Sequence, residues 1–218
     1  METGECVMKD WIDVTMAISP SIMVYKNKEE KMPKFIVRAT HDKDGHHESS
    51  ICMDLHTGTH IDMPKHMLKE GHSSDAFNLE SVNGRCVVVD FSKSYKHEVD
   101  DEFLKFYKFE KNDIVIIKTK NSFDKTFNYE YDFLNASGAE FLKNQGVKAV
   151  GIDALGIERN VPGHPTHRIL LGNGIYIIEG LALAEIEEGI YEFMCIPLKI
   201  ADVEGLPARA FLRSIKDV

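Results

Sequence analysis

The sequence lacks a long hydrophobic segment, because no apolar run approaches the roughly 20 residues that a membrane-spanning helix needs. Residues 1–10 contain several charges and no uninterrupted apolar core, so they do not resemble a secretory signal. Positive charge is also scarce: 26 Lys and Arg stand against 35 Asp and Glu, which leaves a net charge of −9. There is no excess of cations to follow a phosphate backbone or an anionic bilayer. We therefore expect neither nucleic acid nor a membrane as a partner.

Cysteine is rare as well, and the four cysteines form no CxxC pair. They are Cys6, Cys52, Cys86 and Cys195. A chain of this size can be stable without disulfides, so the simplest interpretation is reduced thiols in a cytoplasmic protein. Free cysteine is among the most frequently buried residue types, and we expect all four to pack as small hydrophobic side chains.

The chain also lacks internal repeats, low-complexity tracts and any linker rich in Pro, Ser or Gly. Its 218 residues are enough to bury a sizeable core, and 43% of them are hydrophobic against 28% charged, the balance of a folded soluble protein. This predicts one domain over residues 1–218.

Short β-branched runs of strand length recur along the chain. They cover residues 86–91, 114–118, 147–152, 175–179 and 193–200. Their almost continuous apolarity predicts strands that are buried on both faces. Helices fit between them: Ser137 and Glu140 form a capping box for a helix that stops at Gly146, a second is expected over 183–188, and 100–107 is a weaker candidate. This mixture predicts an α/β fold.

The polar stretches at residues 26–34 and 40–50 are expected to form surface loops or exposed turns. The second contains His41, His46 and His47 around Gly45. We interpret these three histidines as solvated loop residues with no part in metal binding.

The segment DLHTGTHIDMPKH concentrates three histidines and two aspartates within thirteen residues. Gly58, Pro64 and the β-branched residues disfavour a helix there. In an extended chain the side chains alternate, so His56, His60 and Asp62 lie on one face and form a candidate metal site. Pro64 interrupts the strand, and His66 is then free to lie beside the metal as a proton carrier.

The stretch PGHPTHRILLGNGIYIIEGL offers further ligands, His167 and Glu179, and two geometries bring them together. In one, Pro165 or Thr166 begins a short helical turn that Gly172 ends, and a strand then leads to Glu179. In the other, residues 172–174 form a hairpin loop with His167 opposite Glu179. Pro165 favours the first. Spacing alone leaves His164 open as an alternative ligand.

The run HTGTHIDMPKH resembles the HxGTHxDxPxH motif of the cyclase family, which includes bacterial kynurenine formamidases and isatin hydrolases. Residues 11–15 (WIDVT) are similar to the family's opening strand and residues 151–153 (GID) to its central one. The closing segments, IIEGLALAEIEEGIYEFMCIPLKI and LPARAFLR, are similar as well. The resemblance covers nearly the whole chain.

The resemblance implies a swivelling β/β/α single domain that forms a homodimer or homotetramer, with the site near a subunit boundary. It makes His66 the catalytic histidine. The metal ligands that it implies are His56, His60, Asp62, His167 and Glu179. Imidazole and carboxylate ligands suit Zn²⁺, our first choice, or Mn²⁺, as one ion or two.

The activity that the resemblance implies is arylformamidase-like hydrolysis of an amide C–N bond, with N-formylkynurenine as the model substrate and metal-activated water as the nucleophile. Two positions depart from the family. The loop SPSIMVYKNKEEKMP replaces the usual P-G-D motif with its nearby Trp, and Gly156 stands where Ser or Thr is usual. A lactam, lactone or ester hydrolase is therefore the alternative. A metal-dependent binding protein that has lost catalysis is the third.

Overall fold

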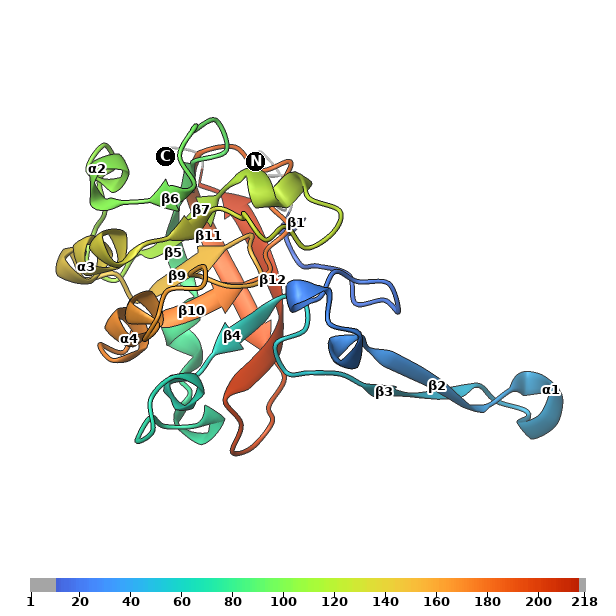
Figure 1. Ribbon diagram of the computed structural model, residues 1–218. Coiled ribbons are helices and arrows are strands. Elements are labelled where there is room, and N and C mark those ends of the chain that lie inside the picture. The colour runs from blue at the N-terminus through green and yellow to red at the C-terminus, as the bar shows by residue number, and fades with distance from the viewer. Residues whose placement is uncertain (1–10, 216–218) are drawn as a thin grey trace, which may run out of the picture.

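The computed structural model describes residues 11–215, which form a closed sheet with helices on one side and a long hairpin that projects from it (Figure 1). The strands are β1 (Ile12–Asp13), β2 (Lys34–Ala39), β3 (Glu48–Cys52), β4 (His60–Asp62), β5 (Gly84–Asp90), β6 (Glu98–Val99), β7 (Ile114–Lys118), β8 (Phe133–Leu134), β9 (Ala149–Ile152), β10 (Tyr176–Glu179), β11 (Gly189–Pro197) and β12 (Gly205–Ser214). The α-helices are α1 (His41–Asp44), α2 (Asp101–Leu104), α3 (Ala136–Gln145) and α4 (Pro165–Leu171).

The main sheet closes on itself as a barrel. Its strands follow the order β12–β11–β5–β7–β9–β10–β4, and β4 pairs back with β12, while β1 adds to the outer edge of β12. The four strands β5, β7, β9 and β10 are parallel, and the remaining pairings in this sheet are antiparallel. The predicted α/β class is confirmed, with a mixed, barrel-like sheet at its centre.

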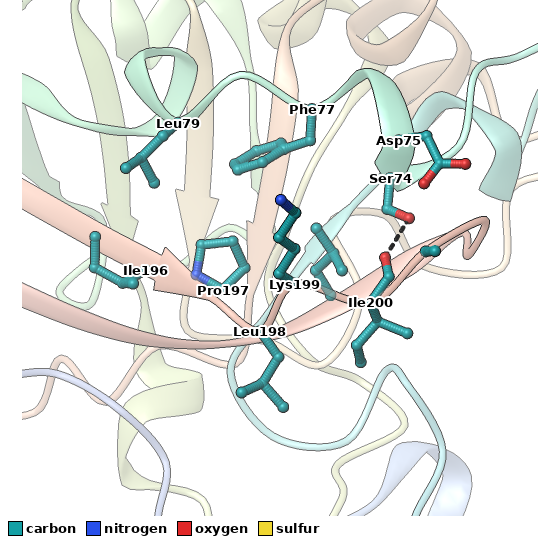
Figure 2. Close-up of a pocket in the computed structure, with 11 residues that line it drawn as sticks. Ser74, Asp75, Phe77, Leu79, Ile196, Pro197, Leu198, Lys199 and Ile200 are labelled. Carbon is teal, nitrogen blue, oxygen red and sulfur yellow. Dashed lines mark hydrogen bonds between the residues drawn. The ribbon is translucent and has the colours of Figure 1, made fainter.

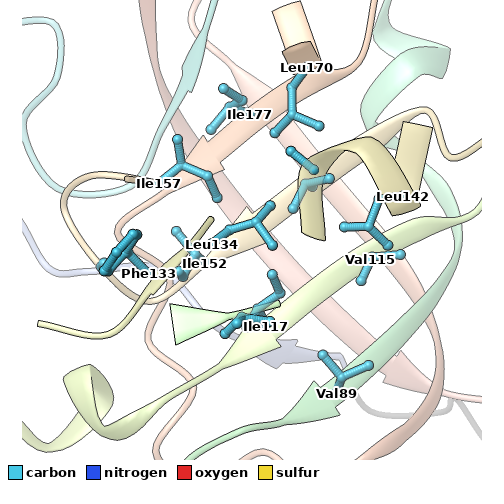
Figure 3. Packing of buried hydrophobic residues seen from close by; sticks show 14 of the residues in the cluster. Val89, Val115, Ile117, Phe133, Leu134, Leu142, Ile152, Ile157, Leu170 and Ile177 are labelled. Carbon is cyan, nitrogen blue, oxygen red and sulfur yellow. The ribbon is translucent and has the colours of Figure 1, made fainter. Parts of the chain in front are cut away.

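Both faces of the barrel strands are buried, which explains the near-continuous apolarity of their sequences. Alternate residues such as Val88, Ile116 and Ile178 fill the inside of the barrel. The residues between them belong to a second core under α3 and α4, which Figure 3 shows from close by. The figure labels these members of the second core, from the strands and from the elements that cover them: Val89, Val115, Ile117, Phe133, Leu134, Leu142, Ile152, Ile157, Leu170 and Ile177.

Four predicted strands are found within two residues of their expected bounds, whereas the strand predicted at 193–200 is found at Gly189–Pro197. Two predictions about helices are wrong. Residues 183–188 form an irregular turn and no helix. Leu183 and Ile186 are both buried, and the Lys118 ammonium donates hydrogen bonds to the Ala184 and Ile186 carbonyls. Helix α3 exists and ends at left-handed Gly146, but its N-cap is Asn135, whose side chain accepts from the Gly138 N–H.

The hairpin of β2 and β3, which we call the arm, was not predicted. It extends away from the barrel and carries the short helix α1 at its tip (Figure 1). The aromatic and β-branched run Phe35–Val37 was the available signal. His41, His46 and His47 are exposed at this tip, as predicted.

Among the cysteines that the structure describes, Cys86 and Cys195 are buried and free, as expected. Cys52 is also free but exposed at the end of the arm, so its predicted burial is wrong. Cys6 lies outside the described residues. None of the helices between residues 11 and 215 has the length and apolar character required to span a bilayer.

Candidate metal centre

Three of the predicted ligands meet because of the pairing between β4 and β10. The antiparallel register sets Glu179 directly opposite His60 and Ile177 opposite Asp62. Ile61 and Ile178 point into the barrel, so His60, Asp62 and Glu179 share the outer face, where opposite side chains lie close together. The His60 Nε2 atom is 3.4 Å from both Asp62 Oδ1 and Glu179 Oε2.

His56 reaches the same place from a tight turn that precedes β4. The Asp54 carboxylate accepts from the His56 backbone N–H at 3.0 Å and fixes the start of this turn. Gly58 follows with a left-handed φ of 64° and packs against Gly180, where a side chain would collide with the Gly58 carbonyl. The turn leaves His56 Nδ1 2.9 Å from Asp62 Oδ1.

His167 completes the cluster from α4, the helix that begins at Pro165 as the first of the two geometries predicts. Its Nε2 lies 3.8 Å from Asp62 Oδ2 and 3.6 Å from Glu179 Oε1. Its other nitrogen, Nδ1, donates to Glu158 Oε1 at 2.6 Å. The alternative geometry, a hairpin through residues 172–174, is wrong, because α4 continues to Leu171 before β10 begins.

Glu158 is a site residue that sequence reasoning missed. It is buried and accepts from the His164 ring at 3.1 Å and from the Thr166 N–H at 2.9 Å as well as from His167. It therefore fixes which nitrogen of His167 faces the cluster. A carboxylate nine residues before a histidine is not a recognisable motif, although the apolar residues before it could have marked it as buried.

The donor set fits a cation on the evidence of its unpartnered atoms. Both Asp62 carboxylate oxygens and the Nε2 atoms of His56 and His60 are buried without a hydrogen-bond partner. The His60 Nδ1–H donates to the Gly58 carbonyl at 2.9 Å, so its Nε2 presents a lone pair to the carboxylates. Lone pairs converging in a buried space are stable only around a proton or a metal ion.

The electrostatics of the cluster lead to the same conclusion. Burial by itself would lower the pKa of His60 and His167, but the neighbouring carboxylates outweigh burial and raise each pKa to about 10. Burial would raise the pKa of Asp62, yet His56 and His60 hold it well below its usual value. The carboxylates thus stay ionised and strongly favour positive charge between them.

His66 lies beside the cluster on the turn Pro64–His66. Its ring centroid is 4.2 Å from that of His56 and 5.9 Å from that of His167. Burial, together with the neighbouring imidazoles of His56 and His167, lowers its pKa even though Asp62 and Glu179 act in the opposite direction. A neutral imidazole at this position can accept a proton at one ring nitrogen.

A cavity of about 280 Å³ opens onto the cluster. Its walls bring the site histidines together with residues from distant parts of the chain. They are Tyr25, Lys28, Lys31, His56, His66, Met67, Leu155, Gly156, Glu158, His164, His167 and Glu179.

A larger cavity of about 590 Å³ lies between residues 74–79 and 196–201 (Figure 2). Its labelled walls are mainly apolar, with Lys199 and Asp75 the charged exceptions. The site histidines line the smaller cavity and not this one.

Comparison with known proteins supports this geometry. A family model named Cyclase, with the description "Putative cyclase", matches residues 12–159, which is more than half of the chain. The chain belongs to the cyclase family. Cyclase-family membership agrees with the position of His56, His60, Asp62 and His66, all of which fall within the matched residues.

Individual relatives extend the match to the rest of the chain. A kynurenine formamidase of Salinibacter ruber is 29% identical over 94% of this chain and 98% of its own. The kynurenine formamidase of Erythrobacter litoralis is 34% identical over 77% of each chain. A solved structure described as a predicted metal-dependent hydrolase from Bacillus stearothermophilus is 39% identical, covers 93% of this chain and 97% of its own, and superimposes with a TM-score of 0.84.

These comparisons confirm the family, the fold class and the assignment as a hydrolase. The structure brings all five predicted ligands and His66 to one place. His164, the alternative ligand, is half exposed and groups with Glu158 and His167 rather than with Asp62. The metal-binding role of the five and the proton-carrying role of His66 stay predictions.

Proposed function

We propose that this protein is an arylformamidase-like hydrolase that cleaves the amide C–N bond of an aryl formamide such as N-formylkynurenine. The observation that carries the proposal is the buried convergence of unpartnered ligand atoms from His56, His60 and Asp62 beside a cavity that ends at His66. The kynurenine formamidases among the relatives support the choice of an aryl formamide.

The metal that we propose is Zn²⁺, as one ion or two, with Mn²⁺ as the alternative. Its ligands would be His56, His60, Asp62, His167 and Glu179. Nitrogen and carboxylate ligands without thiolate suit either ion. When bound, such an ion lowers the pKa of water and polarises a carbonyl oxygen.

The side chains of this chain supply the remaining parts of the reaction. Glu158 holds a proton on His167 Nδ1 and so keeps Nε2 available as a ligand atom. Hydrolysis needs a proton moved from the attacking water to the leaving amine nitrogen. His66, whose lowered pKa leaves it neutral at pH 7, accepts that proton at a ring nitrogen and donates it as the C–N bond breaks.

The second candidate function is hydrolysis of a lactam, lactone or ester by the same groups. The wall of the cavity favours it, because Tyr25 comes from the segment that departs from the formamidase pattern and Gly156 lies against it. A side chain at 156 would meet the Tyr131 hydroxyl oxygen at 2.8 Å and the Tyr25 ring at 3.4 Å, so this wall is built differently. Retention of His66 argues against the third candidate, a binding protein without catalysis.

A substrate screen with the zinc- and manganese-loaded protein separates these functions. Arylformamidase function predicts turnover of aryl formamides that is abolished by a chelator and restored by the metal. Faster turnover of a lactam, lactone or ester under the same conditions would favour the second candidate. Tight binding without turnover of any of them would favour the third.

We further propose that the protein is a homodimer or homotetramer. The arm supports this, because Phe35, Val37 and Ile51 share one face of it and are each about half exposed, and an isolated two-stranded hairpin is marginally stable in water. Monomeric sedimentation at micromolar concentration would contradict it.

The free thiols favour a cytoplasmic location, which cell fractionation can test.

A further inference from the structure

The cavity beside the metal centre has a one-sided distribution of charge on its outer wall. Lys28 and Lys31 line it from the turn Glu29–Lys31 and the residue before that turn. The carboxylates that also line it, Glu158 and Glu179, lie in its depth and are already engaged by histidines. Of the lysines and carboxylates that line the cavity, only Lys28 and Lys31 are partly exposed to solvent.

The two lysines differ in how strongly a neighbouring carboxylate neutralises their charge. Lys31 Nζ donates to Asp54 Oδ2 at 2.8 Å, and the other Asp54 oxygen holds the His56 N–H. Lys31 is thus a structural part of the turn that carries His56. Lys28 Nζ lies 3.9 Å from Glu30 Oε1, and both side chains are largely in solvent, so this pair contributes little. The Lys28 ammonium is therefore not strongly paired within the protein and is available to bind an anionic ligand.

The rest of the cavity is suited to an aromatic body. Tyr25, Met67 and Leu155 form its apolar walls. Its volume of about 280 Å³ lies at the small end of ligand pockets and is comparable with a single substituted ring. Tyr25, Lys28 and His66 line the same cavity, so an occupant with its reacting bond at His66 and its ring against Tyr25 could extend to Lys28.

We propose that Lys28 is a specificity-determining residue that binds a carboxylate at the end of the substrate remote from the scissile amide. This inference rests on the proposed amidase function.

The test compares two probes that differ only in charge, 4-formamidophenylacetate and 4-formamidophenylacetamide, with the zinc-loaded enzyme. Lys28→Gln is expected to raise KM for the carboxylate about fivefold and to leave KM for the carboxamide and both kcat values unchanged. Added salt should raise KM for the carboxylate with the unsubstituted enzyme and have a smaller effect in Lys28→Gln.

Lys34→Gln is the matched control, because it removes the same charge from an exposed position six residues along that does not line the cavity. Equal changes of KM for both probes, or equal changes in Lys28→Gln and Lys34→Gln, would overturn the proposal.

Equilibrium binding of the two product amines is measured in parallel, so that charge preference is observed even without turnover. Absence of turnover with both probes contradicts the amidase function alone, provided that the carboxylated amine still binds more tightly and loses that advantage in Lys28→Gln. Absence of any preference in binding and in turnover contradicts the role of Lys28.

Discussion

At the scale of single residues, the cluster is unusual in how many of its polar atoms face one another without hydrogen bonding. Asp62 is the centre of it, with His56, His60 and His167 each within 4 Å of its carboxylate. Carboxylate and imidazole groups buried at this density are costly unless a cation lies among them. A divalent ion satisfies all of these groups at once, and this is why the residue types point to a metal site.

Glu158 provides the first prediction at this scale. Its replacement by Gln keeps the shape but removes the charge that holds the Nδ1 proton of His167. We expect Glu158→Gln to bind zinc about 10- to 100-fold more weakly, the usual effect of losing such a partner of a metal-bound histidine. Competition against a chromophoric chelator measures this directly. Asp132→Asn is the control, because Asp132 is a buried carboxylate beside a different histidine, His97.

Unchanged zinc affinity in Glu158→Gln would show that Glu158 has no part in positioning His167. Lower affinity in both variants would instead indicate a general loss of folded structure, which circular dichroism would reveal.

The meeting of the five candidate ligands could be predicted from the sequence, but the places of Glu158 and Lys28 beside them could not. His56, His60 and Asp62 lie within seven residues and match a specific motif. Glu158 acquires its role only because α4 places His167 over it, a contact between elements that the spacing does not encode. Lys28 reaches the cavity wall through the course of a loop that has no regular pattern.

At the scale of elements, the site depends on the strand register around β4. β4 has only three residues, yet it pairs with β10 on one side and β12 on the other, and both pairings are needed to close the barrel. A slip of one residue would exchange the outward-facing His60 and Asp62 with the inward-facing Ile61 and Met63. Burial of these apolar side chains inside the barrel therefore also orients the ligands.

The first residue of β12 gives the prediction at this scale. A Cβ atom at Gly205 would lie 2.9 Å from His56 Nε2, so Gly205→Ala should displace the His56 ring. We expect a loss of zinc affinity with little loss of fold, measured by metal titration and thermal unfolding. Gly189→Ala at the start of β11 is the matched control, because its added Cβ meets only the Tyr191 ring at 3.4 Å.

Native zinc affinity in Gly205→Ala would mean that His56 is not held against this strand. A similar loss of affinity in Gly189→Ala would show that the effect is not specific to the ring of His56.

Elements were predictable where a single local pattern decides the structure. The five β-branched runs became strands because their apolar faces are buried on both sides of one sheet. The segment at residues 183–188 also looks helical, but burial of Leu183 and Ile186 and the bonds from Lys118 fix it as turns. Such tertiary contacts override local preference.

At the scale of the whole molecule, residues far apart in the sequence meet on one side of a barrel. The segment around His56 comes from the first third of the chain, and α4 and β10 come from the last third. Closure through β4 joins them, which no local pattern predicts. The arm leaves the barrel between the loop that carries Lys28 and the turn that carries His56, so a partner that holds the arm would also steady the cavity (Figure 1).

The most direct test measures metal content and turnover together in two purified variants. His66→Ala removes the proton carrier and leaves the ligand set intact, so it should retain the metal and lose about 10²- to 10⁴-fold in turnover. His60→Ala removes a ligand at the centre of the cluster and should lose both the metal and the activity. A His60→Ala protein that hydrolyses its substrate without bound metal would contradict the account.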